Sequence, residues 1–142
     1  MSSIRPSTFL RRVLWLDAAS CAGMGVLLAT ASGLLSGLLN LPAGLLRESA
    51  MVLLAFAALL AFLATRTHLA RGAVWTVIVV NAIWVIDSIV LLFTGWVQPN
   101  LFGHVFVVGQ AAVVAALAEL EYLGCASPPR WSSRMREPPL NG

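Results

Sequence analysis

One acidic residue, Asp87, stands in the middle of a long apolar stretch, "NAIWVIDSIVLLFTGW", at 81–96. An aspartate at the centre of a bilayer costs roughly 2.5–3.5 kcal/mol, so an acid in such a place is a functional-site candidate. Two roles fit Asp87. It can serve as a hydrogen-bonded clamp between two helices, or as a site that binds a proton or a cation.

A helical wheel with about 100° per residue gathers the polar residues of this stretch on one arc and leaves an aliphatic arc opposite. Gln110, in the next apolar stretch, falls at about the same depth as Asp87. We therefore expect the two side chains to form a hydrogen-bonded pair. The predicted intramembrane polar site consists of Asp87, Asn81, Ser88, Gln110 and Trp84.

The remaining ionisable residues are expected near the ends of the apolar stretches. Asp17, Glu119 and Glu121 lie within a turn or two of a cytoplasmic end, where we expect them to reach water or nearby arginines. His68 and His104 fall near opposite ends of the predicted helices, so they cannot share one metal ion. The sequence therefore predicts no metal site.

Motifs for catalysis are absent from the sequence. It contains no nucleophile elbow, HExxH, CxxC or phosphate-binding loop, and Cys21 and Cys125 have no partner at metal or redox spacing. The basic residues are dispersed rather than gathered into a patch for nucleic acid. We therefore expect no enzymatic activity, no cofactor and no nucleic-acid partner.

The elements that carry these residues follow from composition. Of 142 residues, 59% are hydrophobic and 11% are charged, which indicates an integral membrane protein. Four apolar stretches, at 13–39, 45–64, 73–96 and 101–123, each reach the roughly 20 residues that a helix needs to cross the bilayer. The stretches are continuous rather than alternating, which favours helices over a β-barrel.

Short connections between the stretches predict an antiparallel bundle of four transmembrane helices. Apart from Arg47, the arginines fall before the first stretch, between the second and third, and after the fourth. The positive-inside rule then places both termini in the cytoplasm. The expected organisation is a cytoplasmic segment at 1–12, a transmembrane domain at 13–123 and an irregular cytoplasmic tail at 124–142.

The first apolar stretch carries small residues at intervals of four, following an acid at its cytoplasmic end. Such a ridge lets helix backbones approach closely, and van der Waals contact is a main force between helices in lipid. The pattern predicts a tight helix contact, either within the chain or between two chains. The ridge consists of Asp17, Cys21, Gly25, Ala29, Gly33 and Gly37.

Three short segments follow or lie within the predicted helices: "LPAGLLR" at 41–47, "NAIWVIDS" at 81–88 and "LAELEYLG" at 117–124. The chain resembles the many small four-span proteins of bacterial inner membranes that have no assigned function. The resemblance implies a location and no activity. We expect an accessory or stabilising subunit, or a small binding module, that associates with lipids and other transmembrane helices. The alternative is a small oligomeric transporter or channel in which Asp87 couples a proton or a cation.

Overall fold

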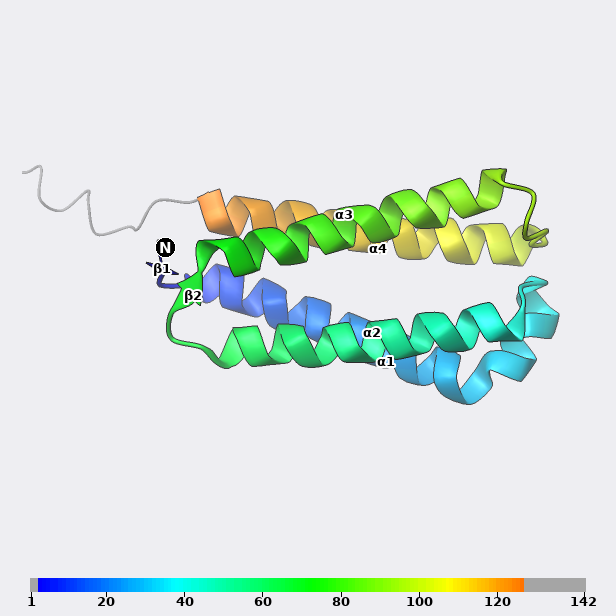
Figure 1. Cartoon of the computed structure of the whole chain (residues 1–142), viewed down its shortest axis with the longest axis horizontal. Helices are drawn as coiled ribbons and strands as arrows, with labels where there is room; N and C mark the ends of the chain where they lie inside the picture. Colours follow the sequence, from blue (N-terminus) through cyan, green and yellow to red (C-terminus); the bar gives the residue numbers. More distant parts are fainter. Residues whose placement is uncertain (1–2, 127–142) are drawn as a thin grey trace, which may run out of the picture.

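Four long helices make up almost all of the computed structural model, which describes residues 3–126 (Figure 1). They are α1 (Thr8–Leu39), α2 (Ala43–Thr65), α3 (Arg71–Phe93) and α4 (Leu101–Ala126), with two short strands, β1 (Ser3–Ile4) and β2 (Leu69–Ala70). Each helix is long and apolar enough to cross a membrane. The predicted all-helical class is confirmed, and the four helices are those of a multi-pass membrane protein.

The helix ends differ from the predicted ones for local reasons. Helix α1 begins earlier than 13, because the Ser7 hydroxyl caps it by accepting a hydrogen bond from the Leu10 N–H at 3.1 Å. Helix α3 ends before 96, since Gly95 has φ +71° and turns the chain. Helix α4 continues to Ala126. The rest of the predicted tail lies outside the described residues.

The helices form two hairpins, α1 with α2 and α3 with α4, which meet chiefly where α1 packs on α4 (Figure 1). At one end β1 pairs with β2, with Ser3 opposite Ala70, so the starts of α1 and α3 lie together. The Arg11 guanidinium also donates to the Arg66 carbonyl at 3.1 Å. Helices α2 and α3 have little contact with each other in the described residues, so the arrangement is open on that side.

At the opposite end Asn100 ties the two hairpins together. Its side-chain nitrogen donates to the Leu38 carbonyl at 2.7 Å, and its backbone N–H donates to the Leu39 carbonyl at 3.2 Å. These carbonyls belong to the last turn of α1, where no intrahelical donor is left for them. Asn100 also caps α4 by accepting from the Gly103 N–H at 2.9 Å. One side chain therefore satisfies the end of one helix and the start of another.

Packing between α1 and α2 follows an alternation of three and four residues, as in left-handed helix pairs. Except for Leu63, the buried residues of α2 follow the pattern: Leu46, Ala50, Leu53, Ala57, Leu60 and Ala64. The corresponding residues of α1, which we call the α1 seam, are Leu10, Leu14, Asp17, Cys21, Gly25, Leu28 and Ser32.

The small-residue ridge of α1 is buried over its first half and exposed over its second. A Cβ on Gly25 would come within 2.8 Å of Leu54 Cγ, whereas Gly33 and Gly37 have nothing within 4 Å. A spacing of exactly four advances the helix face by about 40° each time, so the ridge gradually leaves the α1 seam. The contact predicted for the ridge therefore lies within the chain at Gly25, and Gly33 and Gly37 face away from it.

This difference between two glycines of one helix is testable. Gly25→Leu should lower stability by about 1–3 kcal/mol or more, because the larger side chain overlaps Leu54 and the α2 backbone. Gly33→Leu should change it by less than about 0.5 kcal/mol, since nothing in the described chain lies near it. Thermal unfolding in detergent measures both variants. Equal losses would contradict the assignment, and a changed oligomer for Gly33→Leu would place that half of the ridge between chains.

Candidate functional site

The most buried polar group in the described residues is a cluster contributed by α1, α3 and α4. The Asn81 side-chain nitrogen of α3 donates to Asp17 Oδ2 at 2.9 Å and to Glu121 Oε2 at 3.3 Å. The Cys21 thiol lies one turn after Asp17 and donates to its Oδ1 at 3.5 Å. Asp17 and Glu121 are both 0% exposed, and Asn81 is 3% exposed. We call Asp17, Asn81 and Glu121 the carboxyl cluster.

The helices place these side chains by the same period that builds the core. Asp17 belongs to the α1 seam, and Glu121 belongs to a similar series in α4: Gly103, Val107, Ala111, Val114, Leu117, Glu121 and Gly124. Gly124 fits against Leu10, with a built Cβ only 3.2 Å from the Leu10 side chain, which holds this end of α4 close to α1. The close contact brings the two carboxyls to one amide.

The expectation that Asp17 and Glu121 reach water or arginines is wrong, because both are fully buried. Glu119, two residues from Glu121 and on another side of α4, is exposed as expected. Distance from a helix end was the wrong criterion. The criterion that would have found the cluster is the three-and-four period, since it places Asp17 and Glu121 at interior positions.

The hydrogen bonds of the carboxyl cluster leave one atom without a partner. Both hydrogens of the Asn81 amide are used, one for each carboxyl. Glu121 Oε1 is buried and has no hydrogen-bond partner among the residues that the structure describes. Within residues 3–126 the bonds to these carboxyls come from an amide and a thiol rather than from a basic side chain. The same part of the chain has no group of three His, Cys, Asp or Glu side chains suited to a metal ion.

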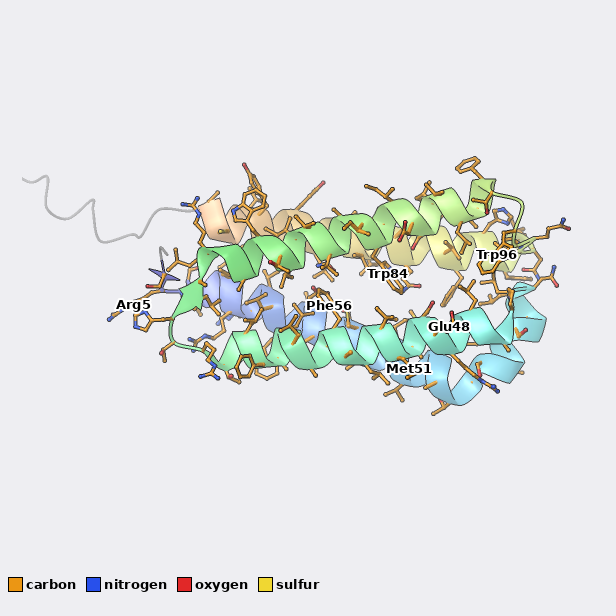
Figure 2. The ribbon with its side chains drawn as sticks, viewed as in Figure 1. Arg5, Glu48, Met51, Phe56, Trp84 and Trp96 are labelled. Carbon is orange, nitrogen blue, oxygen red and sulfur yellow. The ribbon has the colours of Figure 1, made fainter. Side chains whose placement is uncertain are left out.

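Asp87 lies elsewhere, in a groove of about 490 Å³ between the start of α2 and the second half of α3. Its walls include Leu45 and Ser49 from α2, and Trp84, Asp87 and Ser88 from α3. Figure 2 shows Trp84 pointing from α3 toward α2. Asn81 is the last buried residue of α3, and the groove begins just after it, at Trp84.

The groove is mostly apolar with a few polar groups. Asp87 is exposed, and the carboxyl makes no hydrogen bond to Gln110 within the described residues. The Ser88 hydroxyl donates to the Trp84 carbonyl at 2.7 Å, so it is satisfied within α3. Trp84 Nε1 is buried and has no acceptor within residues 3–126. The ring of Trp96, which is 72% exposed, completes the outer end.

The five residues of the predicted intramembrane site therefore fall into separate places. Trp84, Asp87 and Ser88 share the groove, Asn81 belongs to the carboxyl cluster, and Gln110 is partly buried on α4. Arg47, near the start of α2, does not line the groove and donates from Nε to Ser32 Oγ of α1 at 3.1 Å. Several residues of the aliphatic arc, Val79, Ile83, Ile86 and Val90, are each about half exposed or more.

Comparison with protein-family models, with curated proteins and with solved structures gave no match for this chain. The two polar sites are therefore interpreted from their own geometry.

Asn81 holds the carboxyl cluster together, and its removal is expected to be costly. Asn81→Leu leaves Asp17 Oδ2 and Glu121 Oε2 without their donor in a closed site, which should lower stability by about 1–3 kcal/mol. Ser88→Ala, in the same helix, removes a hydroxyl that bonds only to its own helix and should cost less than about 0.5 kcal/mol. Denaturation in mixed micelles compares them. A similar loss of stability in both variants would mean that the hydrogen bonds of Asn81 stabilise the fold no more than the hydroxyl of Ser88 does.

Proposed function

We propose that this chain is a non-enzymatic protein of the bacterial inner membrane that works as a small binding module, with the groove beside Asp87 as its binding site. The observation that carries the proposal is the groove itself. Two hairpins that closed fully would bury α3 along its length, yet α3 is buried only as far as Asn81. Beyond that residue the chain leaves an apolar space of about 490 Å³, within the usual range for small-molecule sites.

The chemistry of the walls defines the kind of ligand. The Asp87 carboxyl has no hydrogen-bond or ion-pair partner within residues 3–126. The indole rings of Trp84 and Trp96 line the same groove. A carboxylate beside aromatic faces suits an organic cation, because both attract positive charge. The apolar remainder suits a hydrophobic body. The proposed ligand is therefore a lipophilic cation that enters from the membrane.

Within this proposal the four helices cross the membrane as an antiparallel bundle, with both termini in the cytoplasm. The groove then opens in the half of the bilayer away from the cytoplasm, since it lies toward the ends of α1 and α3. The β1–β2 pairing and the shared carbonyl contacts of Asn100 support opposite ends of this arrangement. The arginine distribution supports the orientation.

A second candidate function is a small oligomeric transporter or channel in which Asp87 couples a proton or a cation. The observation that favours it is the exposed, unpaired state of the Asp87 carboxyl on a helix that faces lipid over much of its length. Flux separates the two functions. A transporter moves the cation across vesicles in a manner that depends on a proton gradient, whereas a binding module binds the cation without moving it.

Orientation is testable by labelling single cysteines in intact cells. Gln98→Cys, in the loop between α3 and α4, should react with a membrane-impermeant maleimide, and Thr67→Cys, in the loop after α2, should react only after lysis. Both positions are exposed, and Asn100 is avoided because it supports two helix ends. Cys125→Ser removes the half-buried native thiol, and Cys21 is buried. Labelling of Thr67→Cys from outside would reverse the proposed orientation.

Ligand binding is testable with tetraphenylphosphonium, a lipophilic cation, and with tetraphenylborate, an anion of nearly the same shape. The cation should quench tryptophan fluorescence of the purified protein in detergent and bind at least about tenfold more tightly than the anion. Asp87→Asn should weaken cation binding by about tenfold or more, because it removes the charge and keeps the shape.

Glu48→Gln is the matched control for the ligand experiment. Glu48 is an exposed acid at the same end of α2 but does not line the groove, so its loss should leave binding of the cation unchanged (Figure 2). Equal affinity for the cation and the anion would refute the proposed ligand class. Co-purification of another transmembrane protein that blocks the groove would instead identify the site as a contact for a partner helix.

A further inference from the structure

The carboxyl cluster is the most buried polar site outside the groove. Its hydrogen bonds leave one carboxyl oxygen without a partner in the described residues. Asp17 and Glu121 are acids that are both fully buried, and they accept from one amide nitrogen. A carboxylate can only accept hydrogen bonds, whereas a protonated carboxyl also donates one. With Glu121 Oε1 unpartnered, the cluster has buried acceptor atoms in excess and one donor too few. One additional proton on a carboxyl oxygen would supply the missing hydrogen-bond donor.

No other group in the described chain balances two negative charges at this place. The titratable groups that contribute to the cluster are Asp17 and Cys21 from α1 and Glu121 from α4, and α3 contributes the neutral Asn81. Helix α2 has no ionisable residue from 49 to 65. Two ionised carboxylates bonded to one neutral amide would repel each other strongly.

We infer that Asp17 and Glu121 form a binding site for a single proton, which the two carboxyls share around the Asn81 amide. The proton supplies the donor that Glu121 Oε1 lacks and leaves the cluster with one negative charge instead of two. Asn81 links α3 to both carboxyls, so the bound proton also stabilises the tie between α3 and α1. This inference concerns different residues from the groove and stands without the proposed ligand.

The consequence is a stability that falls as pH rises. The folded protein holds a proton that the unfolded chain releases once the pH is above the ordinary range of carboxyl titration. The folded state then binds more protons than the unfolded state, and stability declines with increasing pH. When the proton leaves, two negative charges face the same amide, so the contact of α3 with α1 weakens. The protein thereby responds to proton concentration through the packing of its two hairpins.

The test is thermal unfolding of the purified protein in detergent from about pH 5 to about pH 9. The melting temperature of the wild type should fall by roughly 5 °C or more over this range. Glu121→Gln keeps the size of the side chain and supplies permanent N–H donors in place of the proton, so most of the decline should disappear. Asp17→Asn should act in the same way and serves if Glu121→Gln does not fold.

Glu119→Gln is the matched control, since Glu119 is an exposed acid two residues before Glu121 on the same helix. It should retain the pH dependence of the wild type. A decline that is the same in wild type, Glu121→Gln and Asp17→Asn would overturn the proton site.

Infrared spectroscopy provides a readout that does not depend on stability. With Asp87→Asn as the background, a band from a protonated carboxyl should persist at neutral pH, and Glu121→Gln or Asp17→Asn should remove or shift it. Absence of any protonated carboxyl at neutral pH in that background would overturn the inference, even where both neutral variants of the cluster fail to fold.

Discussion

The packing of α3 against the other helices depends on one buried amide, Asn81. It is the last buried residue of α3, and it bonds to acids from two other helices. In a medium without water each of these polar groups must find its partner inside the protein. The same bonds therefore join three buried side chains and limit how far α3 can separate from α1.

The position of Asn81 also marks the difference in burial between the two halves of α3. Before it, α3 buries Val74 and Val77, and Trp75 meets Tyr122 of α4 edge to face with ring centroids 5.9 Å apart. After it, α3 has no buried residue and faces the groove and its surroundings. The α1 and α2 hairpin, in contrast, is packed along a regular seam. The closely packed α1–α2 hairpin thus supports the α3–α4 hairpin, which is attached to it at both ends.

The two acid sites differ in their surroundings more than in their chemistry. Asp17 and Glu121 are enclosed and already bonded, so they are suited to hold something as small as a proton. Asp87 is exposed on an open groove with indole rings nearby, which is the reason that we propose it as the binding site for a larger molecule. Both follow from the rule that an ionisable group in lipid needs a partner, which the first site contains and the second lacks.

The sequence by itself determined the all-helical class of the protein and the approximate positions of its four helices, because hydrophobicity and length are properties of each segment alone. It also identified Asp87 as unusual, predicted the aliphatic face of α3 and included Asn81 among the polar residues that matter. The tertiary structure decided which polar groups meet. Whether Asn81 reaches Asp17 and Glu121 depends on how four helices rotate and slide against one another, and that register is set by close packing between segments far apart in the chain.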